Sequence, residues 1–126
     1  MLDKAPVMPV LPVTNLKRAR GFYEEKLGLN PSGEIKNRQV NYKCGNGSTL
    51  HLYERSEPTK ADHTAVTFEV NNVESSVKEL SKKGVVFEEY DMPGLKTVNG
   101  IARVDGEIGA WFKDTEGNIL CVHQII

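Results

Sequence analysis

The chain contains one hairpin-like stretch twice, once in its first half and once near its end. The later copy, residues 109–124, has two aromatic residues in a short apolar run, a turn rich in Asp, Glu, Gly and Asn, and a second β-prone run. The earlier copy is residues 44–54, and aligning the two turn glycines places His51 at the position of Cys121. A repeat of this kind favours a fold built from two similar modules.

The elements before each hairpin also repeat. Asn15 and Asn72 are suited to cap the N-terminus of a helix, because an Asn side chain accepts a hydrogen bond from a free backbone N–H. Apolar residues at helical spacing follow each of them, and a strand-like run precedes each, at residues 8–13 and 63–70. The spacing therefore predicts the order β-α-β-β-β in each half of the chain.

The expected boundaries are module one at residues 6–55, a linker at 56–62 and module two at 63–126, all within one domain of 126 residues. Prolines in the first strand predict that it lies at a sheet edge, because proline cannot donate to a β-ladder. Module one should contain further strands at the ranges 33–36, 39–44 and 48–54. Module two should contain one at 85–89.

The stretch 90–108 is long and rich in glycine. It is either a loop, which at this length is usually functional or mobile and would suit a lid over a site, or it contains the middle strand of module two.

Composition narrows the class of protein. Sixteen basic and seventeen acidic side chains nearly cancel, without blocks of like charge, which argues against nucleic-acid binding and a polybasic membrane segment. No apolar run approaches the length of a membrane span and no signal-peptide pattern is present, so we expect a cytoplasmic protein. Cys44 and Cys121 are expected to be reduced, buried thiols.

Alternation along the strands separates two faces of the predicted sheets. One face is apolar and should pack beneath the helices. The other face mixes apolar and hydrogen-bonding side chains: Met8, Val10, His51, Tyr53, Ala65, Thr67, Glu69, Trp111, Cys121 and His123. This mixture is typical of a ligand cavity, and an interface between two copies of the chain is the alternative.

Two segments, VTNLKRARGFYEEKLGL at 13–29 and DTEGNIL at 114–120, resemble motifs of the vicinal oxygen chelate superfamily, also called the glyoxalase/bleomycin-resistance/dioxygenase fold. Thr115 replaces the proline of the family's turn motif. The resemblance covers essentially the whole chain. It implies an α+β fold of two βαβββ modules, with curved mixed β-sheets that enclose a cavity and helices on the outer face. It also implies a homodimer.

The resemblance also bears on a metal cofactor. Metal-dependent members carry His or Glu ligands at four positions, which correspond here to Met8, His51, Ala65 and Cys121. Only His51 is an ordinary ligand for a divalent ion. We therefore expect no metal at the usual site and no other cofactor. A divalent metal would need a site rebuilt from His51, His63, Glu69 and His123.

The expected function is binding of a small apolar or aromatic molecule. Met8, Val10, Tyr53 and Trp111 would contact its apolar body. The groups that would orient it or complete the site are His51, Thr67, Glu69, Cys121 and His123. His51 and Glu69 are the candidates for acid–base catalysis. The alternative is a lyase, isomerase or dioxygenase of the same superfamily, metal-dependent or metal-free. The sequence leaves open the identity of the ligand and whether a cavity lies within one chain or across a dimer.

Overall fold

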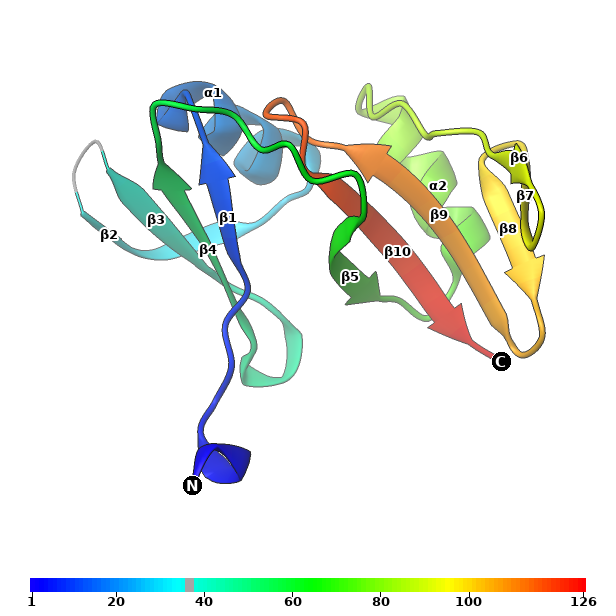
Figure 1. Cartoon of the computed structure of the whole chain (residues 1–126), viewed down its shortest axis with the longest axis horizontal. Coiled ribbons are helices and arrows are strands. Elements are labelled where there is room, and N and C mark those ends of the chain that lie inside the picture. Colours follow the sequence, from blue (N-terminus) through cyan, green and yellow to red (C-terminus); the bar gives the residue numbers. More distant parts are fainter. Residues whose placement is uncertain (36–37) are drawn as a thin grey trace. The chain divides into compact units, whose positions relative to one another are not determined.

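The computed structural model describes residues 1–35 and 38–126 and divides into two compact units, Met1–Thr59 and Lys60–Ile126. Each unit has one mixed β-sheet with a helix on one of its faces (Figure 1). The predicted fold class, α+β with two modules that each contain a mixed β-sheet and a helix, is confirmed.

Unit one contains a four-stranded sheet in the order β1-β4-β3-β2. Its strands are β1 (Val10–Val13), β2 (Asn30–Ile35), β3 (Gln39–Lys43) and β4 (Thr49–Glu54). Strand β1 runs parallel to β4, and the other neighbours are antiparallel. The proline-bearing strand β1 lies at the edge of the sheet, as predicted. It begins at Val10, so Met8 and Pro9 precede it, which corrects the predicted start at residue 8. Lys36, in the strand predicted at 33–36, lies outside the described residues.

Helix α1 (Leu16–Gly21) begins where its cap was predicted, since the Asn15 side chain accepts a hydrogen bond from the Arg18 N–H at 2.9 Å. It continues into a short π-helical segment, η2 (Phe22–Lys26). Gly28, with φ of +74°, follows the end of this segment. Short 3₁₀ turns, η1 (Leu2–Lys4) and η3 (Gly45–Gly47), lie outside the sheet.

Unit two contains a six-stranded sheet in the order β5-β10-β9-β8-β7-β6. Its strands are β5 (Thr64–Glu69), β6 (Asp91–Met92), β7 (Leu95–Val98), β8 (Ile101–Val104), β9 (Glu107–Lys113) and β10 (Ile119–Ile125). Helix α2 (Val73–Lys82) packs against β9 and β10, and Asn72 caps it by accepting from the Ser75 N–H at 2.9 Å. The order β5-β10-β9-β8 repeats β1-β4-β3-β2, and β7 and β6 extend the edge beyond β8.

Two predictions for unit two need correction. Residues 85–89 do not form a strand, and Phe87 makes only an isolated bridge to Phe112. The Val85 N–H bonds back to the Leu80 carbonyl after the end of α2, and the Glu88 N–H donates to the Trp111 carbonyl of β9 at 2.8 Å, so the segment touches the sheet at one point only. Residues 90–108 form β6, β7, β8 and the start of β9. The strand alternative therefore holds, and the lid interpretation is wrong.

The turn between β9 and β10 is held by Asp114, which is buried. Its Oδ1 accepts hydrogen bonds from the backbone N–H groups of Glu116 and Asn118, each at 2.8 Å, and its Oδ2 accepts from the Asn118 side chain at 2.8 Å. Gly117 has φ of +88°, as its place in the turn predicted. Hydrogen bonds within the DTEGN motif therefore stabilise the turn, and Thr115 is accommodated in place of proline.

The alternation of faces agrees with the burial pattern on the helix side of both sheets. In unit one, the buried side chains of β1, β3 and β4 are Leu11, Val13, Val40, Tyr42, Leu50 and Leu52. In unit two, Leu120, Val122, Ala110 and Phe112 are buried on β10 and β9. The opposite faces, which we call inner face one and inner face two, carry the candidate site residues.

Candidate functional site

Inner face one consists of the side chains of β1, β3 and β4 that alternate with the core positions. The register places Val10, His51 and Asn41 in one row across three strands, with Tyr53 two residues beyond His51 on β4. The ring centroids of His51 and Tyr53 are 6.4 Å apart. Val10 is 49% exposed, so an apolar surface borders the polar pair.

His51 and Asn41 each carry a buried polar atom without a hydrogen-bond partner. The atoms are Nδ1 of His51 and Oδ1 of Asn41, each with less than 1 Å² of exposed surface, and no donor or acceptor among the described residues reaches them. A buried polar atom left unpaired costs about 1–3 kcal/mol. Such atoms in a native fold call for an explanation, and a polar group of a ligand or an ordered water is an ordinary one.

Asn41 was not among the candidates that the sequence analysis selected. Its signal was available, because β3 pairs with β4 and alternation along residues 39–44 places Gln39 and Asn41 on the same face as His51. Met8 precedes β1 and is 42% exposed, although the adjacent Pro9 carbonyl accepts the His51 N–H at 2.9 Å.

Inner face two carries the predicted residues of unit two in two cross-strand rows. One row contains Thr67, Cys121 and Trp111, and the next contains Glu69, His123 and Gly109, from β5, β10 and β9 respectively. The register therefore brings five of the predicted residues onto one face of one sheet.

Trp111 is fixed over this face by three neighbours. Its indole N–H donates to Thr64 Oγ1 at 3.0 Å, and the Tyr90 ring packs edge-on at 5.7 Å between centroids. A Cβ added to Gly109 would lie 3.4 Å from Trp111 Cη2 and 3.7 Å from Cys121 Sγ, so the far edge of the indole lies over the Gly109 backbone. Tyr90 is a second residue that the sequence analysis missed, because its stretch had no assigned register.

Cys121 is almost fully buried, at 4% exposure. Burial raises the pKa of its thiol, and hydrogen bonds from the Ala110 backbone and the Thr67 side chain only partly offset that effect. The Sγ atom lies 3.3 Å from the Val122 carbonyl oxygen, to which the thiol donates. A buried thiol that stays neutral is a poor nucleophile.

His123 lies beside a carboxylate. Its Nε2 is 3.3 Å from Glu107 Oε1, and its side chain is 23% exposed. Glu69, the other predicted acid–base residue, is its register partner on β5. His63 is exposed, and its Nδ1 lies 3.2 Å from the Thr64 carbonyl oxygen.

The usual metal site of the resembled family does not fit these residues. Ala65 has no donor atom and Met8 offers only a thioether, so of the four positions only His51 and Cys121 carry ordinary donor groups. Across residues 1–35 and 38–126, no three His, Cys, Asp or Glu side chains gather as a metal site requires. In unit two, His63, Glu69 and His123 thus form no such group.

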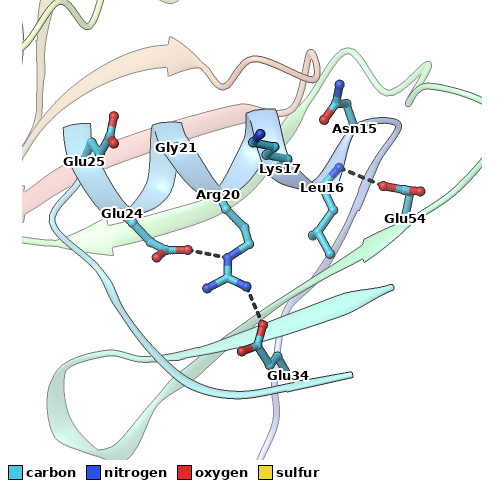
Figure 2. A pocket seen from close by; sticks show the side chains of 9 residues that line it. All are labelled: Asn15, Leu16, Lys17, Arg20, Gly21, Glu24, Glu25, Glu34 and Glu54. Carbon is cyan, nitrogen blue, oxygen red and sulfur yellow. Dashed lines mark hydrogen bonds and ion pairs between the residues drawn. The ribbon is translucent and has the colours of Figure 1, made fainter. Parts of the chain in front are cut away.

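A separate pocket of about 620 Å³ lies beside helix α1 in unit one (Figure 2). Four of its charged residues pair with one another or with the backbone: Arg20, Glu24, Glu34 and Glu54. Arg20 donates to Glu24 at 2.6 Å and to Glu34 at 2.5 Å, and Glu54 accepts the Leu16 N–H at 2.8 Å. The Tyr42 hydroxyl also donates to Glu24. Burial raises the pKa of Tyr42, and the hydrogen bond to the Glu24 carboxylate raises it further. We interpret the cluster as the support of α1, and none of the predicted site residues lines it.

Family comparison agrees with this architecture. The profile of the Glyoxalase/Bleomycin resistance protein/Dioxygenase superfamily matches residues 6–122, so the chain belongs to that superfamily. The resemblance stated from the sequence motifs is confirmed. No curated protein matches the chain in sequence.

Several solved structures share the fold. A putative glyoxalase family protein from Bacillus anthracis is 18% identical with a TM-score of 0.75, covering 98% of this chain and 96% of its own. TnmS3, an antibiotic binding protein from a Streptomyces species, is 19% identical with a TM-score of 0.69 over 100% and 99% of the two chains. Lactoylglutathione lyase from Agrobacterium tumefaciens is 20% identical with a TM-score of 0.68 over 96% and 93%. These similarities concern the fold. None of the helices in the described part of the chain has the length and hydropathy of a membrane span.

Proposed function

We propose that the protein binds a small aromatic molecule on inner face one, without a metal. The support is the pair of buried polar atoms, His51 Nδ1 and Asn41 Oδ1, which no residue in the described ranges pairs with. They lie on neighbouring strands in one register row, beside the Tyr53 ring and the exposed side chain of Val10. A few convergent polar groups at the border of an apolar surface are typical of a small-molecule site.

The two atoms restrict the chemistry of the ligand. Asn41 Oδ1 accepts a hydrogen bond, so the ligand has a hydroxyl or N–H group at its polar edge. His51 Nδ1 donates or accepts according to its tautomer, so a second polar atom of the ligand pairs with it. The flat apolar body of the ligand lies against Tyr53 and Val10.

Inner face two belongs to the same proposal as a second surface of similar chemistry. Trp111 and Tyr90 supply aromatic area there, and Thr67 and Glu69 supply polar groups in adjacent rows. TnmS3 is described as an antibiotic binding protein, which is consistent with a binding role for this fold. The proposal includes a cytoplasmic homodimer, and light scattering of the purified protein tests its oligomeric state.

Isothermal titration calorimetry with naphthol, and with aromatic acids and amides, tests the proposal. A ligand bound by the wild type should lose about fivefold to 100-fold in affinity in His51→Ala and in Asn41→Ala, because each variant removes one partner of a buried hydrogen bond. His63→Ala, at an exposed histidine in unit two, is the matched control. Equal affinity of all four proteins would refute binding at inner face one.

A further inference from the structure

The β7–β8 hairpin extends the sheet of unit two beyond β9 and β10, against which helix α2 packs (Figure 1). Alternation places Ile101 and Arg103 on the helix side of β8, because Arg103 pairs with the core residue Ile108 of β9. Val98 is the register partner of Ile101, so it lies on the same side of β7, and it is 63% exposed. The helix side of this hairpin therefore carries an apolar surface that α2 leaves open.

A pocket of about 600 Å³ includes this surface in its lining. Its walls combine aliphatic side chains with polar and charged ones: Glu74, Lys96, Val98, Asn99, Ile101 and Arg103. Glu74 belongs to the first turn of α2, and the other residues belong to the hairpin and its turn. The volume is in the range of pockets that hold one small molecule. The pocket lies on the opposite side of the sheet from inner face two.

Two cationic side chains lie next to each other in this pocket. Continuing the antiparallel register of β7 and β8 places Lys96 opposite Arg103, and like charges opposite each other on neighbouring strands repel. Arg103 donates a hydrogen bond to the Glu74 carboxylate. No salt bridge or hydrogen bond joins Lys96 to another described residue, including Asp91, its register partner on β6. An anion between the two cations would relieve their repulsion and give Lys96 a partner.

We propose that this pocket binds a small aliphatic carboxylate. The carboxylate lies between the Lys96 ammonium and the Arg103 guanidinium, and both donate charge-assisted hydrogen bonds to it. The alkyl chain lies along Val98 and Ile101. The chain is aliphatic because the lining has branched aliphatic side chains and no aromatic ring. The site is in unit two, so it is separate from inner face one and does not depend on the function proposed there.

Glu74 competes with the ligand for Arg103. Its Oε1 already accepts a hydrogen bond from Nη2 of that guanidinium. A guanidinium has five N–H donors, so the ligand bonds those that Glu74 leaves. Because both carboxylates are negative, the charge of Glu74 opposes binding. Removing that charge should therefore strengthen binding, whereas a purely structural role of Glu74 predicts weaker binding.

An NMR titration of the nitrogen-15-labelled full chain with octanoate tests the proposal. Amide signals of residues 95–104 and of the first turn of α2 should shift and reach saturation. Added salt should weaken binding, because the charged groups are exposed. Butanoate should bind at least about tenfold more weakly, because it lacks four of the methylene groups. Octanamide has the same chain without the charge, and it should bind at least about threefold more weakly.

Variants of the charged residues test the headgroup. Lys96→Gln and Arg103→Gln should each weaken octanoate binding by about threefold or more, because each removes a charge-assisted hydrogen bond. Glu74→Gln should strengthen it by about twofold to fivefold, since the amide oxygen still accepts from Arg103 but no longer repels the ligand. Lys43→Gln, at an exposed strand lysine in unit one, is the matched control and should bind as wild type does.

Variants of the valines test the chain. Val98→Ser should weaken octanoate binding by about fivefold, because it removes apolar surface from the pocket. Val104→Ser is the matched control, because Val104 is 49% exposed on the opposite face of β8, and its affinity should equal that of wild type. Circular dichroism confirms that each variant is folded.

Three results would overturn the inference. One is the absence of saturable shifts in the hairpin with octanoate. Another is equal affinity of wild type, Lys96→Gln and Arg103→Gln. The third is weaker binding by Glu74→Gln, because it would mean that the carboxylate of Glu74 supports the ligand and does not compete with it.

Discussion

Replacing Asn41 with valine should make the free protein more stable while weakening ligand binding. The Asn41 Oδ1 atom has less than 1 Å² of exposed surface and no partner in the described chain, so the folded state bears a desolvation cost of about 1–3 kcal/mol there. Valine removes the unpaired atom at similar size. It also favours a β-strand over asparagine by up to about 1 kcal/mol. The Ser32 hydroxyl donates to the Asn41 backbone carbonyl, which the substitution keeps.

Together these effects predict a gain of about 1–4 kcal/mol in the free energy of unfolding. For a domain of this size each kcal/mol corresponds to a rise in Tm of about 3–6 °C, measured by calorimetry or by circular dichroism. Affinity for an aromatic ligand should fall at least about fivefold in the same variant, because its hydrogen bond to Oδ1 is lost.

Asn118→Val is the matched control, and it should lower the stability that Asn41→Val raises. Asn118 is 3% exposed and its side chain donates to the Asp114 carboxylate at 2.8 Å, so its loss should lower stability by about 1.5–3 kcal/mol. If Asn41→Val also lowers stability, then Oδ1 has a partner in the free protein, such as a bound water, and the reasoning for a ligand site at inner face one fails.

Three further predictions concern stability. Asn72→Ala should cost about 1 kcal/mol in urea unfolding, because the Ser75 N–H loses its cap; no change would mean that α2 does not depend on it. Gly100→Ala should cost about 1–3 kcal/mol, since φ is +78° and the new Cβ would lie 3.0 Å from Phe87 Cβ; a thermal melt like that of wild type would contradict this. Burial raises the pKa of the Cys121 thiol above its ordinary 9.0, so the fold favours the neutral thiol. The stability that the protonated thiol contributes is fully present below pH 9 and is lost as the pH rises through the higher pKa of the folded state. Cys121→Ala should therefore flatten the alkaline decline in the free energy of unfolding. Curves of stability against pH that run parallel for the variant and the wild type would refute this.

Local chemistry made the helix caps and the first edge strand predictable. Asn15 and Asn72 bond backbone N–H groups three residues ahead, which needs no tertiary information. Strand β1 lies at an edge, where the missing N–H of Pro12 costs no ladder bond. The strand begins at Val10 and not at residue 8, because Pro9 has no N–H and bonds His51 only through its carbonyl.

The stretch 90–108 was predictable in part, and the signal was overlooked. Asn99 and Gly100 both have positive φ and connect β7 to β8, and Asp105-Gly106 connects β8 to β9. Asn-Gly and Asp-Gly pairs are strong hairpin signals, which outweigh the reading of glycines as a loop. At 85–89 the contact with β9 is limited to one bridge, Phe87 to Phe112, and alternation along the segment does not reveal how far pairing with a neighbour extends.

The residues of the candidate site were also predictable only in part. Strand parity placed Thr67, Glu69 and His123 on one face, because it needs only the register of neighbouring strands. The pairing of His123 with Glu107, and the position of Tyr90 against Trp111, depend on hairpins that bring distant residues together. Those contacts were outside the reach of spacing within a single strand.

The parallel pairing of β1 with β4, and of β5 with β10, has a consequence for synthesis on the ribosome. The first strand of each unit finds its neighbour only after the last strand of that unit has been made. The first strand of a nascent unit therefore stays unpaired until the final hairpin of that unit has emerged. Each unit should consequently fold late and in a single step. Ribosome-stalled chains that end just before β4 should consequently stay sensitive to protease, whereas chains that have released β4 should acquire protection.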